Sequence, residues 1–263
     1  MSLLRALLRG LPAYLWAGWG AIASLLLLFA AWEAVSARYG PLVMPDPRTT
    51  MATLVALFDR GDAWRELAVT TRRALAGFTL ALVAGSALGL AAGVSMTASM
   101  MSRPLVTALM GTPPIAWLVL SMLWFGASDG TPVFTVFVAG FPVIFAGALQ
   151  GTRTLDNHLR KMAEAFRLPR RMMLVDVYAP HVVSYLFPAW ITALGMSWKV
   201  VVMAELLATQ DGVGASLAVT RSHLDTAATM AWIVAIVGSL LAVEYLLLEP
   251  VKREVERWRE AVT

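Results

Sequence analysis

Long apolar segments separated by shorter polar stretches dominate the chain. A helix that spans a bilayer needs about 20 mostly apolar residues. Six segments meet this requirement: 13–35, 74–95, 105–125, 133–150, 182–207 and 229–248. The fourth is short, and Pro142 inside it predicts a bend. The pattern therefore predicts an all-α integral membrane protein with about six transmembrane helices, forming one domain over residues 1–263.

The first apolar segment has two interpretations. Arg5 and Arg9 precede it, and Val35-Ser36-Ala37 resembles a signal-peptide cleavage site. The apolar run from Leu11 to Val35, however, is longer than the roughly 7–15 apolar residues of a cleaved signal. We therefore expect a retained first helix.

The polar connection at 38–73 also carries helical patterns. Two sets of apolar residues follow the spacing of one helix face, before and after a stop at residues 59–61. The sets are Met51, Leu54, Val55 and Phe58, then Trp64, Leu67, Ala68 and Thr71. We expect short amphipathic helices on the outer face of the membrane, which would pack against the bundle or contribute to binding.

Small residues recur every four positions in the second apolar segment. They are Gly77, Ala81, Gly85, Gly89 and Gly93. Such a stripe lets the backbone of another helix approach closely, so it predicts tight helix packing and does not by itself indicate transport.

Composition supports a membrane protein. Hydrophobic residues make up 59% of the chain and charged residues only 14%, whereas a soluble domain carries about 25% charged residues. The net charge of +4 would suggest nucleic-acid binding in a soluble protein, but membrane proteins concentrate Lys and Arg in cytoplasmic loops. Most basic residues lie in the segments on the same side of the membrane as the N-terminus, which predicts that both termini are in the cytoplasm. Because the chain has no cysteine, disulfides and Cys-ligated metal are excluded.

The segment at 151–181 is longer than a connection between two spans requires. It mixes basic with apolar residues, and an apolar stripe at intervals of four, three and four predicts a helix. The stripe consists of Leu155, Leu159, Met162 and Phe166. Such a helix is typical of a surface that docks a cytoplasmic partner. Packing of the stripe on the adjacent helix ends is an equally open alternative.

Charged and proline residues inside the apolar segments mark a candidate path for a solute. Lys199 lies within the fifth segment, where a charge costs about 2.5–3.5 kcal/mol on insertion scales and usually faces a cavity or a partner. It would attract an anion, pair with a carboxylate of another helix, or extend to the interface. Pro113-Pro114 break helical hydrogen bonding in the third segment, which indicates either a path or a passive kink. The expected pathway residues are Thr112, Pro113, Trp117, Trp198, Lys199 and Glu205.

Four stretches, in order along the chain, match motifs of one family. Two lie in the third and fifth segments: Gly111-Thr112-Pro113-Pro114-Ile115-Ala116-Trp117 with Leu123-Trp124-Phe125-Gly126, and Gly195-Met196-Ser197-Trp198-Lys199 leading to Ala204-Glu205-Leu206-Leu207 and Gly212-Val213-Gly214. A third runs from Lys161-Met162-Ala163 to Ala179-Pro180, and the last is Pro250 to Arg259. Together they resemble binding-protein-dependent permeases of the ATP-binding cassette class, in the nitrate, sulfonate and taurine branch. The third stretch is similar to the family's Glu-Ala-Ala loop, with Lys161 at the Glu position and Arg167 at the Gly position; Glu164-Ala165 offers an alternative register.

The resemblance implies a type I importer permease fold with a cytoplasmic coupling helix, in a bacterial inner membrane. Two copies would form a homodimer on two ATP-binding cassette ATPase subunits, and a periplasmic solute-binding protein would deliver a small solute such as a sulfonate, taurine or nitrate. The chain lacks a Gly-x-x-x-x-Gly-Lys-Ser/Thr loop, so ATP and Mg would bind the partner ATPase, and we expect neither a cofactor nor a metal on this chain. The implied coupling residues are Leu155, Leu159, Lys161, Met162, Ala163, Glu164, Ala165, Phe166, Arg167 and Arg170.

Two other classes of function account less well for the sequence. A self-contained secondary transporter or channel would explain Lys199 and the proline break, but not the long striped segment at 151–181. An intramembrane enzyme is disfavoured, because His158, His181 and His223 fall on both sides of the predicted membrane and no Gly-x-Ser-x-Gly motif accompanies them.

Overall fold

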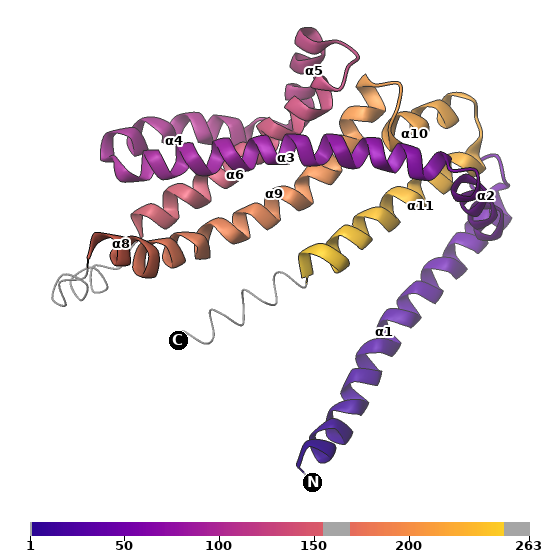
Figure 1. Cartoon of the computed structure of the whole chain (residues 1–263). Coiled ribbons are helices and arrows are strands. Elements are labelled where there is room, and N and C mark those ends of the chain that lie inside the picture. Colours follow the sequence, from indigo (N-terminus) through magenta and orange to yellow (C-terminus); the bar gives the residue numbers. More distant parts are fainter. Residues whose placement is uncertain (1, 155–168, 250–263) are drawn as a thin grey trace.

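The structure is a computed structural model that describes residues 2–154 and 169–249. Within these ranges it is helical and contains no strand (Figure 1). The helices are α1 Ser2–Tyr39, α2 Pro47–Asp59, α3 Asp62–Val94, α4 Met96–Gly111, α5 Pro114–Phe125, α6 Gly130–Arg153, α8 Arg170–Met172, α9 Ala179–Ala208, α10 Val213–Ser222 and α11 Thr226–Ala242, with π-helical segments η1 Met173–Tyr178 and η2 Val243–Leu248.

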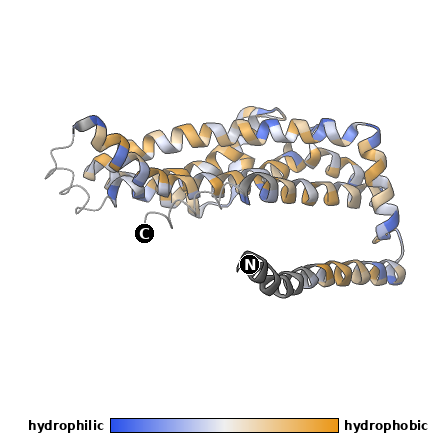
Figure 2. Ribbon diagram, turned by 60° about the horizontal axis from the view of Figure 1, so that its bottom comes forward, coloured by the Kyte–Doolittle hydropathy of each residue, from blue (hydrophilic) through white to orange (hydrophobic). Residues whose placement is uncertain are grey.

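Five helical segments are long and apolar enough to cross a membrane. They are Ile22–Tyr39, Asp62–Val94, Gly130–Arg153, Met173–Ala208 and Thr226–Tyr245. A sixth candidate consists of α4 and α5, which meet at a bend of 93°. Figure 2 shows hydrophobic residues along most of the length of these helices. The prediction of an all-α membrane protein with about six spans is confirmed.

Helices α3, α6 and α9 pack side by side, with α6 between the other two (Figure 1). The small-residue stripe of α3 faces α6: a Cβ built on Gly89 would lie 2.6 Å from the Ala148 Cβ. On the neighbouring face of α6, a Cβ on Gly147 would lie 2.6 Å from the Ala189 Cβ of α9. Glycine is therefore required where the helix backbones meet, as in close membrane helix pairs.

The two ends of the bundle carry different connections, and they are called the turn end and the loop end. The turn end carries the turns at 126–129 and 209–212, where α6 begins and α9 ends. The loop end is where α6 ends at Arg153 and α8 begins at Arg170.

The connection between the first two spans differs in part from the prediction. Helix α2 starts after Asp46, whose carboxylate accepts hydrogen bonds from the Thr49 hydroxyl at 3.1 Å and from the Thr49 backbone N–H at 2.7 Å. These two hydrogen bonds lower the pKa of Asp46. Helix α2 ends at residues 59–61, where Gly61 has φ +83°. The expectation of a second short amphipathic helix is wrong. The residues after Gly61 form the first turns of α3, which continues unbroken to Val94 because no proline follows.

Helix α1 extends away from the other helices (Figure 1). Its side chains at residues 22–30 are exposed, and Trp32 donates a hydrogen bond of 2.9 Å from Nε1 to the Pro45 carbonyl oxygen near α2. An apolar helix exposed on all sides is typical of a surface that faces lipid or another protein.

Candidate functional site

The third span is interrupted at residues 112–113. Thr112 has extended backbone angles of φ −84° and ψ 124°, which the prolines favour because the residue before a proline is excluded from the helical region. The Thr112 hydroxyl donates to the Ala108 carbonyl oxygen at 2.8 Å, so this carbonyl in the last turn of α4 has a hydrogen-bond partner. Helix α5 restarts with Pro114 at its first position, at 93° to α4. The prolines therefore break the span in two, which is more than a kink.

Helix α5 is fixed against α6 and α9 by one face. Leu118 is fully buried in a cluster with Ala204 and Ala208 of α9. The Ser121 and Thr135 hydroxyls lie 3.1 Å apart and join α5 to α6.

The opposite face of α5 lines an open groove of about 680 Å³, which includes Thr112, Trp117 and Leu123. The expected pathway residues Thr112 and Trp117 thus lie on one groove, next to the exposed Pro113. The Trp117 indole N–H is buried without a hydrogen-bond partner. The groove wall is almost entirely apolar, apart from Thr112.

A second groove, of about 590 Å³, lies between α4, α6 and α9 towards the loop end. Its polar wall consists of side chains that can form hydrogen bonds: Gln150, His181, Ser184, Tyr185 and Thr192. No carboxylate lines this groove. Such a wall can replace part of the water shell of a small polar solute without repelling an anion.

Lys199 lies on the face of α9 that continues from this groove. With 100° per residue, His181, Pro188, Thr192 and Lys199 fall within about 20° of one line along the helix. Lys199 is exposed, and no carboxylate among the described residues pairs with it. It lies nine residues before Ala208, about 14 Å along the helix, which is close to half the thickness of an apolar membrane core of about 30 Å.

Trp198 and Glu205, the other two pathway residues expected on α9, point into the protein. Trp198 is 7% exposed and packs with Ala74, Val136 and Val201. Glu205 is fully buried at the turn end. The structure therefore places Lys199 on a free face and the other two side chains inside the bundle.

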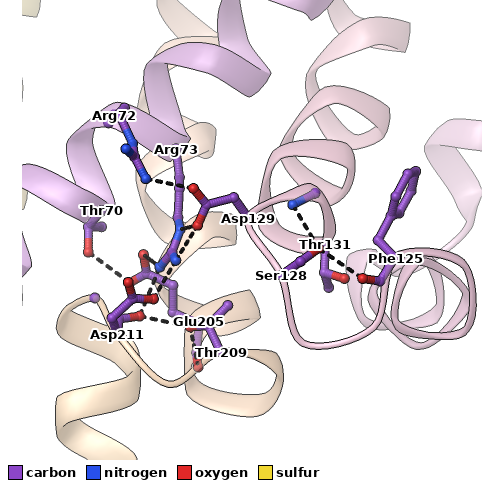
Figure 3. Close-up of polar contacts among 12 residues, drawn as sticks. Thr70, Arg72, Arg73, Phe125, Ser128, Asp129, Thr131, Glu205, Thr209 and Asp211 are labelled. Carbon is purple, nitrogen blue, oxygen red and sulfur yellow. Dashed lines mark hydrogen bonds and ion pairs between the residues drawn. The ribbon is translucent and has the colours of Figure 1, made fainter.

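Glu205 belongs to a buried polar cluster centred on Arg73 of α3, which is 2% exposed (Figure 3). Arg73 makes five hydrogen bonds, as many as a guanidinium has N–H groups. Nε and Nη2 donate to Asp129 Oδ1 at 2.8 and 2.5 Å, and Nη1 donates to Glu205 Oε1 at 3.0 Å. Nη1 also donates to the Asp211 carbonyl oxygen at 2.8 Å, and Nη2 to the Asp211 carboxylate. Arg72 holds the second oxygen of Asp129 at 2.6 Å.

The same cluster caps the start of α10. The backbone N–H groups at residues 212–214 donate in turn to Glu66 Oε2, Thr70 Oγ1 and Glu205 Oε2, at 2.6, 3.0 and 3.2 Å. Thr70 Oγ1 also donates to Glu205 Oε2 at 2.8 Å. These N–H groups have no partner within the helix, and a carboxylate is favoured at a helix N-terminus. The cluster therefore binds α3, α6, α9 and α10 together at the turn end.

The comparison with protein families agrees with the helical, membrane-spanning structure. Residues 79–255 match the model of the binding-protein-dependent transport system inner membrane component. The chain belongs to this family.

Three relatives illustrate how far the similarity of this permease extends. It is 26% identical to the taurine transport system permease protein TauC of Escherichia coli (strain K12) over 250 residues, 92% of this chain and 90% of TauC. It is 26% identical to the putative aliphatic sulfonates transport permease protein SsuC of Bacillus subtilis (strain 168) over 239 residues, 89% of this chain and 86% of SsuC. It is 30% identical to the nitrate import permease protein NrtB of Leptolyngbya laminosa over 156 residues, 59% of this chain and 56% of NrtB.

The coupling residues expected in this permease lie outside the described residues, with one exception. Arg170 begins α8. The flanking positions are described: Arg153 ends α6, and α8 and η1 lead into α9 at the same end of the bundle (Figure 1). In the described part of the chain no group of three or more His, Cys, Asp or Glu side chains could hold a metal ion.

Proposed function

We propose that this permease forms the membrane path of an ATP-driven importer for a small anion. The observation that carries the proposal is Lys199, a cation near mid-membrane depth with no carboxylate partner among the described residues. An ionised side chain at that depth costs several kcal/mol unless it faces a cavity or a partner. The stripe from Lys199 to His181 leads into the groove at the loop end, so an attracted anion has a polar route onward that no carboxylate lines.

The relatives support an anionic solute through their names. Taurine, aliphatic sulfonates, nitrate and bicarbonate appear in the names of similar permeases. Each of these solutes carries a compact anionic group. A single lysine on the path would attract that group without selecting its shape, so we assign the choice of solute to the separate binding protein.

The proposed assembly follows from membership of the family. Two copies of this permease would form a homodimer in a bacterial inner membrane, with the loop end and both chain termini in the cytoplasm. Residues 155–170 would dock two ATPase subunits, which bind ATP and Mg, while a periplasmic solute-binding protein would approach the turn end. Because the permease itself has no nucleotide loop in its sequence, ATP would act through the docked loops.

The test is Lys199→Met in the complete transporter reconstituted in liposomes, with uptake of taurine, methanesulfonate, nitrate and bicarbonate measured in parallel. We expect uptake of the transported anion to fall roughly tenfold, the effect of losing about 1.4 kcal/mol of favourable interaction. Lys199→Arg keeps the charge and should retain most of the uptake.

Lys252→Met is the matched control, because it makes the same chemical change beyond the last predicted span. Undiminished anion uptake by an assembled Lys199→Met transporter would refute the role of Lys199. Equal losses from Lys199→Met and Lys252→Met would also contradict it.

A further inference from the structure

We propose that Arg73 is a positioning residue through which movement at the loop end of the bundle reaches α5 at the turn end. This inference rests on the proposed function, because it takes the segment after Arg153 as the contact with the ATPase. That segment lies between α6 and α9 in the chain, so a displacement of it acts first on these two helices. The question is what keeps their far ends together.

Along most of their length, α3, α6 and α9 are held by backbone contact. A Cβ on Gly77 would lie 2.6 Å from the Val136 Cβ, and one on Gly93 would lie 2.5 Å from the Thr152 Cβ. Contacts of this kind resist compression but contain no polar group that fixes sliding or rotation. One hydrogen bond along this length, from the Trp190 indole N–H to Ser86 Oγ at 3.0 Å, joins α9 to α3 but does not hold α6. A hydrogen-bonded connection between the helices is therefore needed to transmit such motion without loss.

Arg73 supplies that connection at the turn end. Its five N–H groups are divided between Asp129, which precedes α6, and Glu205 and Asp211, which lie at the end of α9 (Figure 3). No N–H group remains for solvent, and the side chain is only 3% exposed. A lysine has three donors from one atom and could not hold both turns in this geometry.

The turn that Arg73 holds through Asp129 is also the attachment of α5. The Thr131 hydroxyl donates to the Gly126 carbonyl oxygen at 2.7 Å, and the Ser128 hydroxyl donates to the Phe125 carbonyl oxygen at 2.8 Å. The turn is thus cross-linked internally and carries the end of α5 as a unit. At its other end, α5 joins α4 only through the extended residues 112–113, which can act as a hinge. The position of α5 therefore depends on the turn that Arg73 holds, as well as on the packing of Leu118 and the Ser121–Thr135 contact against α9 and α6.

The experiment measures whether nucleotide binding changes the surroundings of α5. The chain has no cysteine, so Leu123→Cys places a single thiol on the exposed face of α5. The full-length permease is purified with its ATPase in nanodiscs, and the rate of labelling by a maleimide is compared without nucleotide and after trapping with ATP and vanadate. With Arg73 intact we expect the two rates to differ.

Adding Arg73→Gln should reduce this nucleotide response by about threefold or more, while each assembled complex still hydrolyses ATP. A merely structural role would lower the yield of assembled complex and leave the response of the remaining complexes unchanged. Arg60→Gln is the matched control, because among the described residues the Arg60 side chain bonds only to Ala56 of its own helix end and lies outside the cluster.

Two results would overturn the inference: an unchanged response in Arg73→Gln, or no response at Leu123→Cys with Arg73 intact. If Arg73→Gln does not assemble, Asp129→Asn decides in the same way, since it removes charge from a half-exposed residue and keeps its shape. Absence of an ATPase from the purified permease would instead refute the proposed function, and the inference with it.

Discussion

The contact between α3 and α6 allows one substitution to be worked through in detail. Gly89 lies within the contact, and a Cβ built there meets the Ala148 Cβ and the Phe145 carbonyl oxygen, both at 2.6 Å. Non-bonded carbon atoms attract best at about 3.5–4.0 Å. The carbonyl oxygen belongs to the backbone of α6, so Gly89→Ala must push the two helices apart by about 1 Å at this point.

The expected cost combines two opposing effects. Overpacking of a tight contact costs about 1–3 kcal/mol, whereas replacing glycine by alanine within a helix gains up to about 1 kcal/mol. Gly238 of α11 provides a control, because a Cβ there would meet nothing within 4 Å. The helix gain is common to both variants, so the difference between them isolates the overpacking cost of about 1–3 kcal/mol.

Unfolding in mixed micelles with increasing SDS, followed by tryptophan fluorescence, measures this difference directly, since the chain has 10 tryptophans. We expect Gly89→Ala to be less stable than the parent permease and Gly238→Ala to be equal or more stable. If the two variants have the same free energy of unfolding, the close approach of α3 and α6 is wrong.

Two further predictions concern the turn end and the coupling segment. Gly212→Ala should destabilise the permease by more than about 2 kcal/mol, because the new Cβ lies 2.3 Å from the Glu205 carboxylate and the backbone has φ +97°. Gly40→Ala is the control and should cost only about 1 kcal/mol, because Gly40 has φ +80° but open space around it. Equal losses of stability in thermal unfolding would count against the cluster. Phe166→Asp should abolish co-purification of the ATPase, whereas Phe166→Leu should preserve it, because only Phe166→Asp places a charge in the predicted apolar stripe. If the ATPase still co-purifies with the Phe166→Asp permease, docking through that stripe is excluded.

The spans and the packing stripe could be predicted because each is a local property of the chain. Twenty apolar residues have few alternatives to a spanning helix. Small residues four apart from Gly77 to Gly93 lie on one helix face whatever the partner is. The identity of that partner, α6, depends on tertiary contacts that the pattern does not encode.

The break at Pro113 was predicted for the same local reason, but its size was not. Two prolines remove helical hydrogen bonds wherever they lie. The 93° bend depends on the docking of Leu118 against Ala204 and Ala208, which are far away in sequence. In the connection at 38–73, the pattern showed helix on both sides of Gly61, and it could not show that the second helix continues into the span.

The cluster around Arg73 could not be predicted from the sequence, because it depends on contacts between distant residues. The sequence marks Glu205 as a candidate pathway residue within a span, but its pattern assigns no role to Arg73. Their pairing joins residues 132 positions apart, which no periodicity reveals. Two signals pointed to it: a carboxylate in a span needs a partner, and Arg72-Arg73 are basic residues on the side where basic residues are scarce.

The central claim is that this permease moves its solute only when a separate ATPase supplies the energy. Uptake into liposomes that contain the permease with its ATPase and solute-binding protein, compared with liposomes that contain the permease alone, tests this claim most directly. We predict uptake that requires ATP and all the partner proteins, and no uptake by the permease alone. Equal uptake by the permease alone, without ATP, would contradict the account and identify a self-contained transporter or channel.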